Sequence, residues 1–230
     1  FKLPILPPFM HNEGYPIISL CKAVKWLAGQ VEAAGGVDMF AGFSASEVLY
    51  DGERVVGVRT GDRGVNAKGE RKSNYEPGVD IRAKVTLFTE GTRGHLVKSL
   101  TEKLHLNREH HPQVYATGIK EVWQVNPAKF RKGYVAHTMG YPLDNRTYGG
   151  GFLYHCYDNL VSLGFVVGLD YEDPNQDPHA DFNAFKRHPY VANMLEGGKV
   201  VQYGAKTIPE GGWYAIPQTA VDGALIAGDS

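Results

Sequence analysis

The sequence predicts a mixed α/β protein, with some α+β character, in which a β-rich segment lies between two stretches of α/β type. Three observations support this prediction: an amphipathic helix near the start, a strand, glycine turn and helix near residue 90, and alternating apolar and polar residues after Gln113. The chain has 230 residues, 43% of them hydrophobic, which is enough to bury a core. We expect one large domain or two interleaved domains.

The first α/β stretch begins with a helix. After Ser19 apolar residues recur at helical spacing, and the Gly35-Gly36 pair ends the pattern. A short strand over Val37–Phe40 is predicted to follow.

Two strands, Glu47–Tyr50 and Val55–Arg59, flank an Asp-Gly pair that is typical of a hairpin turn. The next segment, Thr60–Gly78, is polar and rich in glycine, lysine and asparagine, which predicts a surface excursion. Another strand is expected over Ala83–Phe88.

A glycine-bearing turn, Glu90–Gly94, connects that strand to a predicted helix over Leu96–Leu104. Glycines after a strand let the backbone approach a dinucleotide, and an arginine in the turn can meet a phosphate. A plain strand-to-helix turn explains the same residues equally well. The candidate cofactor-binding residues here are Glu90, Gly91, Arg93 and Gly94.

The β-rich segment from Gln113 predicts a mostly antiparallel sheet. A helix over Pro178–His188 is expected to place Phe182 and Phe185 on one face. A strand over Val200–Ala205 follows it.

The last residues, Gly223–Ala227, predict a buried parallel strand that ends at Gly228 and Asp229. An aspartate at the carboxyl end of such a strand accepts hydrogen bonds from sugar or ribityl hydroxyls, although a simple turn explains it as well. Together with the Glu90–Gly94 turn, the pair favours a flavin-binding sheet. The ends of the sequence, which lack an initiator Met and a helix after this strand, predict the interior of a longer enzyme.

A third candidate is the glycine block that follows Tyr148. Glycines at 149 to 151, between aromatic residues, leave room for a flat ring and free amide groups for its carbonyls, which suits a quinone. The alternative is a β-bulge or tight turn in the sheet, with Tyr148, Phe152 and Tyr154 packed in the core. Gly149, Gly150 and Tyr148 are therefore candidate quinone-binding residues.

Composition and residue spacing exclude several classes of function. The net charge of −1 argues against a nucleic-acid partner. Two distant cysteines cannot hold an iron–sulfur cluster, and no histidine spacing indicates a metal site. No catalytic side chain is assigned, since no Ser/His/Asp or Cys/His arrangement is supported. The longest apolar run, Leu160–Leu169, is about half of a membrane span.

Taken together, these motifs make the chain similar to the electron-transfer flavoprotein:ubiquinone oxidoreductase family almost from end to end. Any one of the short motifs is weak evidence alone, whereas a match of this length is strong evidence. The most specific matching segments are Glu90–Leu96, Gly118–Trp123, Pro142–His155, Gly164–Tyr171 and Leu195–Lys199.

The resemblance implies an electron-transferring-flavoprotein dehydrogenase. It would accept electrons from electron-transfer flavoprotein and pass them through FAD and a 4Fe-4S cluster to ubiquinone. It would be a peripheral membrane protein on the bacterial or mitochondrial inner membrane. Gly149 and Gly150 would lie at the quinone, with Tyr148 as a weaker neighbour, and the two cofactor turns would belong to the FAD domain.

The same resemblance implies how the chain is divided. Residues 1–110 would form part of the FAD-binding, Rossmann-like domain, residues 111–209 a quinone-binding β-sheet domain, and residues 210–230 a return to the FAD-binding domain. The first glycine-rich FAD motif would precede Phe1, and the cluster ligands would follow Ser230. We expect these 230 residues alone to be inactive.

Two alternatives stay open. One keeps the FAD fold but changes the reaction, to a geranylgeranyl-reductase-like enzyme or a hydroxylase. The other is a non-catalytic domain that binds a lipid or a protein partner. The apolar segment Leu3–Phe9 either faces lipid or packs on the protein.

Overall fold

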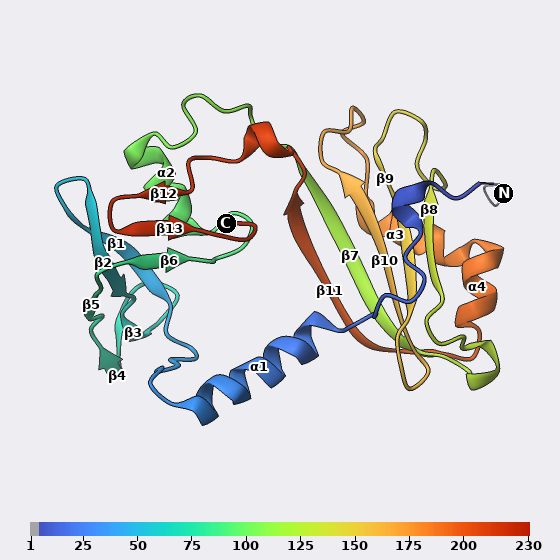
Figure 1. Cartoon of the computed structure of the whole chain (residues 1–230), viewed down its shortest axis with the longest axis horizontal. Coiled ribbons are helices and arrows are strands. Elements are labelled where there is room, and N and C mark those ends of the chain that lie inside the picture. The colour runs from blue at the N-terminus through green and yellow to red at the C-terminus, as the bar shows by residue number, and fades with distance from the viewer. Residues whose placement is uncertain (1–4) are drawn as a thin grey trace.

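The computed structural model describes residues 5–230 and has two parts that lie side by side (Figure 1). One part is a five-stranded sheet with two helices on one face. The other part contains three smaller sheets and a helix, and the long helix α1 (Leu20–Ala34) runs beneath both parts in this view. The fold is therefore mixed α/β, as the sequence predicts.

The five-stranded sheet is antiparallel throughout and has the strand order β11-β7-β10-β9-β8. This confirms the antiparallel prediction for the segment after Gln113. Its strands are β7 (Tyr115–Gln124), β8 (Val135–Met139), β9 (Gly149–His155), β10 (Leu160–Gly168) and β11 (Lys199–Pro209).

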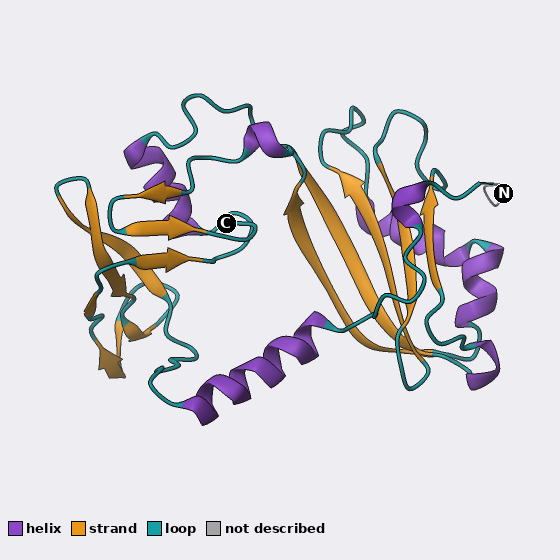
Figure 2. Ribbon diagram, in the orientation of Figure 1, coloured by secondary structure: helices purple, strands orange, loops and turns teal. Residues whose placement is uncertain are grey.

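Two helices, α3 (Pro178–Arg187) and α4 (Pro189–Leu195), cover one face of this sheet (Figure 2). The side chain of Asp177 accepts hydrogen bonds from the first amides of α3, which fixes where the helix begins. Phe182 and Phe185 are buried against the central strand, as predicted. The sequence analysis did not identify α4, which restarts at Pro189 after α3 has ended.

Because side chains alternate along a strand, the sheet has two distinct faces. We call the face packed on α3 and α4 the helix-covered face; on β10 it carries Val161, Leu163, Phe165 and Val167. We call the other the open face. Residues in register on this face include His137, Gly150, Phe152, Tyr154, Ser162, Gly164, Val166, Gly118, Lys120, Val122, Gly204 and Lys206.

The second part begins with the predicted hairpin of β1 (Ala45–Asp51) and β2 (Arg54–Thr60), which β5 (Asp80–Arg82) joins. The polar segment after β2, predicted as a surface excursion, forms a separate hairpin of β3 (Arg63–Val65) and β4 (Arg71–Glu76).

A three-stranded sheet contains both predicted cofactor strands. β6 (Thr86–Phe88) pairs in parallel with β13 (Ala224–Ile226), and β12 (Ala220–Val221) lies on the other side of β13. The terminal strand is therefore parallel, as predicted, while the strand predicted over 83–88 is shorter. Helix α2 (His95–Leu104) packs on this sheet through Leu96, Val97 and Leu100.

The predicted helix α1 is confirmed, but the strand predicted over Val37–Phe40 is wrong. These residues have no regular structure, and the side chains of Val37 and Phe40 are 58% and 64% exposed. An isolated strand has no hydrogen-bond partners, and none of the described strands pairs with this segment. Helix α1 also buries none of its residues.

Short 3-10 helices occupy Pro8–Met10, Pro127–Lys129 and Trp213–Ala215. Within residues 5–230, no helix has the length and hydropathy needed to cross a bilayer. The division into domains at residues 110 and 209 remains a prediction, although the five-stranded sheet contains only strands from between these positions.

Candidate functional site

The two predicted sites meet where the two parts of the molecule join. At the end of β10, the amide of Gly168 donates to the carbonyl of Tyr148, 2.8 Å away. The next amide, of Leu169, donates to the carbonyl of Tyr115 at 2.8 Å. The guanidinium carbon of Arg93 lies 5.7 Å from the centre of the Tyr115 ring. A short chain of contacts therefore connects the glycine block to the cofactor turn.

Close packing of neighbouring atoms explains the glycine block. A Cβ on Gly149 would lie 2.3 Å from the carbonyl oxygen of Val166, and a Cβ on Gly150 would lie 2.1 Å from that of Thr138. A Cβ on Gly151 would lie 2.3 Å from the ring of Phe185. The register of β9 is regular, so the block is not a bulge. Larger residues here would disrupt the sheet itself.

Tyr148 is not packed in the core. Its side chain is 63% exposed, just before β9 begins. Its Cβ lies 3.4 Å from the position that a Cβ on Gly168 would take. Tyr148 is thus available to a ligand at the carboxyl end of β10.

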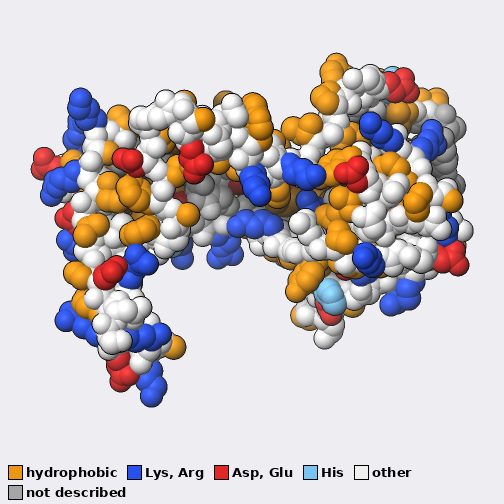
Figure 3. Space-filling model, turned by 90° about the horizontal axis from the view of Figure 1, so that it is seen from below, with side chains coloured by type: hydrophobic (Ala, Val, Ile, Leu, Met, Phe, Trp, Pro, Cys, Tyr) orange, Lys and Arg blue, Asp and Glu red, His pale blue; other side chains and the backbone are white. Residues whose placement is uncertain are grey.

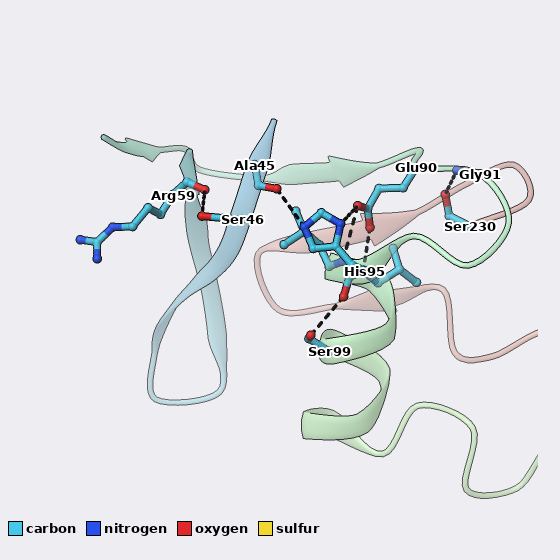
Figure 4. A network of polar contacts seen from close by, with 10 residues as sticks. Ala45, Ser46, Arg59, Glu90, Gly91, His95, Ser99 and Ser230 are labelled. Atoms are coloured by element: carbon cyan, nitrogen blue, oxygen red, sulfur yellow. Dashed lines mark hydrogen bonds and ion pairs between the residues drawn. The ribbon is translucent and has the colours of Figure 1, made fainter. Parts of the chain in front are cut away.

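Glu90 stabilises the start of helix α2. Its carboxylate accepts hydrogen bonds from the amides of Val97 and Leu96, at 2.8 and 3.4 Å, and lies 3.7 Å from Nδ1 of His95 (Figure 4). The Nε2 of His95 donates to the carbonyl of Ala45. Since this carboxylate already occupies the helix N-terminus, a cofactor phosphate would have to bind elsewhere along the turn.

The rest of the turn fits a hydroxyl-bearing ligand such as the ribityl part of FAD. Gly91 has a φ of 73°, and its amide donates to Oγ of Ser230 at 3.0 Å (Figure 4). The hydroxyl of Thr92 is buried and has no hydrogen-bond partner among the described residues. Gly228 has a φ of 71° and open space around it. Ser230 therefore joins the end of the chain to the turn, and the turn contains a buried hydroxyl with no described partner.

Two charged side chains lie in the turn and after the terminal strand, the positive Arg93 and the negative Asp229. Arg93 has a left-handed backbone conformation, with a φ of 62°, which is unusual for a residue with a side chain. Asp229 is exposed and follows Gly228 directly. For Gly94, a Cβ would collide with the side chain of Glu90 at 2.3 Å, so this glycine makes room for the helix cap.

Two lysines that the sequence analysis did not single out lie on the open face. Lys120 is on β7 and Lys206 is on β11. The Nζ of Lys206 lies 4.0 Å from the position that a Cβ on Gly91 would take, so this side chain reaches from the sheet to the cofactor turn. Figure 3 shows basic side chains in the hollow between the two parts of the molecule. The sequence feature that could have drawn attention to these lysines is a glycine two residues before each of them, Gly118 before Lys120 and Gly204 before Lys206.

An aromatic group completes the open face. The rings of Phe152 and Tyr154 stack with centroids 5.2 Å apart, and the Tyr154 hydroxyl lies 3.1 Å from Nε2 of His137. Burial raises the pKa of Tyr154, so its hydroxyl stays protonated at neutral pH. The open face thus presents rings, glycines and two cations.

In the described part of the chain, no group of three or more His, Cys, Asp or Glu residues is placed to hold a metal ion. Both cysteines are free. Of the apolar N-terminal segment, Leu3 lies outside the described residues, whereas Ile5 and Phe9 are each 79% exposed.

Comparison with known proteins gives a consistent result. Residues 115–208, nearly the whole five-stranded sheet, match the family model described as ETF-QO, ubiquinone-binding. The chain is 47% identical over 228 residues to the mitochondrial electron transfer flavoprotein-ubiquinone oxidoreductase of Dictyostelium discoideum, covering 99% of this chain and 37% of that protein. It is 45% identical over 231 residues to the Pseudomonas aeruginosa enzyme, covering 99% of this chain and 42% of that protein.

Solved structures share the fold at low identity. A geranylgeranyl bacteriochlorophyll reductase-like protein from Thermoplasma acidophilum superimposes with a TM-score of 0.63 at 15% identity, covering 90% of this chain and 46% of that one. A flavoprotein/dehydrogenase from Cytophaga hutchinsonii gives 0.56 at 13% identity, with coverages of 89% and 45%.

The fold is therefore shared with these two proteins, while the sequence similarity points to one family. The alignment extends over nearly all of this chain and over about two fifths of its relatives. These 230 residues are homologous, along their whole length, to a segment of the electron transfer flavoprotein-ubiquinone oxidoreductase family.

Proposed function

We propose that this chain supplies the quinone-binding sheet and part of the FAD-binding region of an enzyme that passes electrons from electron-transfer flavoprotein to ubiquinone. One observation supports this most strongly. The sheet that matches the ubiquinone-binding model ends at Tyr115 and Gly168, next to the glycine turn that fits a flavin. An electron carrier and its acceptor must lie close together, and this junction brings their candidate residues together.

In this proposal, FAD binds at the ends of two neighbouring strands. The residues that bind it are Gly91 and Arg93 after β6, and Gly228 and Asp229 after β13. Asp229 accepts hydrogen bonds from ribityl hydroxyls, and Arg93 binds a phosphate. Glu90 acts indirectly, because its carboxylate fixes α2 and thereby the shape of the turn. When bound, FAD supplies redox chemistry in one-electron and two-electron steps, while the protein supplies position and electrostatics.

The quinone would lie at the junction, beside Tyr148 and the start of β9. Its reduction takes up two electrons and two protons and converts each ring carbonyl into a hydroxyl. Gly149 and Gly150 let the neighbouring strands pack closely at this strand end. In this proposal the ring lies against the backbone there, outside the space that side chains at these two positions would fill. The electrons would come from reduced electron-transfer flavoprotein through FAD and a 4Fe-4S cluster bound by other parts of the enzyme.

We also propose attachment to a membrane surface. Ile5 and Phe9, together with Leu6, form an exposed apolar segment beside the five-stranded sheet (Figure 1). Exposed apolar side chains of this kind insert shallowly into a bilayer. The enzyme would then lie on a bacterial or mitochondrial inner membrane, where ubiquinone is dissolved.

The test uses the longer enzyme that contains this sequence. We expect flavin absorption bands that bleach with reduced electron-transfer flavoprotein and recover when a short-chain ubiquinone is added. Arg93→Ala should lower flavin affinity at least tenfold, whereas Arg108→Ala, also in an exposed position, should not change it. Bound flavin without quinone reduction would overturn the proposal in favour of a reductase or hydroxylase of the same fold. Absence of flavin would leave a binding domain.

A further inference from the structure

A single row of residues crosses the open face at the level of Gly150. In strand register, Met139 lies opposite Gly150 on one side and Val166 lies opposite it on the other. The row continues through Gly118 on β7 to Lys206 on β11. It therefore contains a glycine proposed above to lie beside the quinone, and it runs from the edge strand β8 to the strand from which Lys206 reaches the cofactor turn.

The two ends of this row differ in chemistry. At the β11 end, Nζ of Lys206 lies 4.0 Å from the position that a Cβ on Gly91 would take, and Arg93 in the same turn is a second cation. At the β8 end, the side chain of Met139 is apolar. Between the two ends lie two glycines and Val166, which present little side-chain bulk. The row is thus apolar at the edge of the sheet and positively charged towards the cofactor turn.

Packing within the described residues does not explain an exposed methionine at this place. Three residues of β8 lie on the open face. Val135 is 39% exposed, and the ring of His137 contacts the hydroxyl of Tyr154 at 3.1 Å. Met139 is 85% exposed and belongs to neither hydrophobic core. The largest exposed apolar surface on this strand therefore lies directly beside Gly150.

We propose that Met139 contacts the isoprenoid tail of the quinone and that the tail leaves the site across β8. The ring lies against the backbone at Gly150, beside Tyr148, as in the proposed function. A hydrocarbon tail that ran the other way along the row would desolvate the ammonium group of Lys206 without giving it a hydrogen-bond partner, which is costly. The polar ring is therefore the part nearer to the cofactors, and the tail is the part nearer to the edge of the sheet.

This inference rests on the proposed function and names the part of the substrate that the β8 end recognises. Burying an apolar side chain against hydrocarbon is favourable in proportion to the area removed from water. The flexible side chain of methionine also adapts its shape to an irregular chain. In the view of Figure 1, the segment that contains Ile5 and Phe9 lies towards the β8 side of the sheet, so the tail would leave on the side of the proposed membrane contact.

The experiment is Met139→Gln in the longer enzyme, with dissociation constants measured for two quinones. One is a ubiquinone with a decyl tail, and the other is the same ring without a tail. Glutamine keeps the length of the side chain and replaces its apolar end with an amide. We expect the tailed quinone to bind about fivefold more weakly, because the apolar contact is lost. The affinity for the tailless quinone and the flavin content should stay the same.

Two further variants make the test specific. Met139→Leu keeps an apolar side chain and should retain the affinity for the tailed quinone. Val135→Gln makes the same kind of change on the same strand and face, at the other end of β8, and should leave the binding of both quinones unchanged.

The outcomes distinguish this inference from the proposed function. Unchanged binding of the tailed quinone by Met139→Gln would overturn the tail contact and leave the proposed function standing. An equal loss for both quinones would also overturn it, since Met139 would then act on the ring or on the fold. The same would follow if Val135→Gln weakened the tailed quinone as much as Met139→Gln does. If the unsubstituted enzyme binds neither quinone, the proposed function itself fails.

Discussion

The two faces of the five-stranded sheet differ in how completely packing explains their residues. On the helix-covered face, Phe165 is fully buried and its ring lies 5.2 Å from that of Phe185. Even the charged Glu121 is satisfied there, by Lys186 at 2.8 Å and by Nε1 of Trp123 at 2.7 Å. On the open face, no described residue pairs with the Lys120 ammonium group, and no described atom lies within 4 Å of the position that a Cβ on Gly204 would take.

This difference teaches where to look for function in a sheet. Residues selected for folding fill space and satisfy each other's polar groups. Residues that leave space empty and charges free within the described part of the chain are not explained by its packing, and they are the places to test for function. Substitutions at matched positions on the two faces can therefore break or sharpen the distinction.

The largest effect is expected in the aromatic core. Phe165→Ala should lower the free energy of unfolding by about 3–5 kcal/mol, because it leaves a cavity beside Phe185. Val166→Ala, one residue along and on the half-buried open face, should cost about 1 kcal/mol or less. Urea unfolding followed by tryptophan fluorescence, with Trp123 packed against the core of this sheet, measures both. Equal costs would mean that the open face is covered as tightly as the other.

A smaller effect is expected from adding one methyl group. Gly151→Ala should destabilise by about 1–3 kcal/mol, since its Cβ would lie 2.3 Å from the buried ring of Phe185. Gly204→Ala should stabilise by about 0.5–1 kcal/mol, because it removes the entropic cost of glycine without a collision. The same unfolding assay applies. Destabilisation by Gly204→Ala would show that folding requires this glycine.

The smallest effect is a pH dependence that arises on the helix-covered face. His155 is 3% exposed, and its Nδ1 accepts a hydrogen bond from the amide of Arg131 at 3.0 Å. Burial, and then the nearby charge of Arg131, lowers the pKa of this histidine from its ordinary value of 6.5. The unfolded chain therefore binds the proton more readily than the folded chain does.

The contribution of neutral His155 to the free energy of unfolding is therefore complete above about pH 6.5. This contribution is lost as the pH falls towards the lowered pKa of the folded state. We expect the free energy of unfolding to decrease between pH 7.5 and pH 5.5, and His155→Gln to flatten that decrease. His137→Gln, on the open face, is the control for the effect of a histidine-to-glutamine replacement on stability itself. An identical slope for His155→Gln and the unsubstituted chain would contradict this prediction.

Local features of the fold were predictable. The helices α1, α2 and α3 follow apolar spacing that any short window reveals, and the Asp51-Gly52 pair indicates its hairpin turn. Helix α4 was missed because proline at its first residue resembles a simple chain break. The strand predicted over Val37–Phe40 failed because four apolar residues in a row do not reveal whether a partner strand is present.

The candidate site was predictable only in part. Glycine and charge patterns identified the Glu90–Gly94 turn and the block after Tyr148, and the structure places them in neighbouring positions. Two features of the turn could not be predicted, because they depend on how the turn folds. These are the capping of α2 by Glu90 and the burial of the Thr92 hydroxyl without a described partner. Lys120 and Lys206 drew no notice, since single lysines in strands are common.

By itself, the sequence determined the helices, the tight turns, the α/β character and the family, because these depend on residues close together in the chain or on the identity of whole segments. Tertiary structure alone decided which residues oppose each other. Strand register joins positions far apart in sequence, such as Lys120 with Gly204, and it depends on the packing of one entire face against α3 and α4. The difference between a glycine whose Cβ would collide with its neighbours and one with open space beside it exists only once those neighbours are in place.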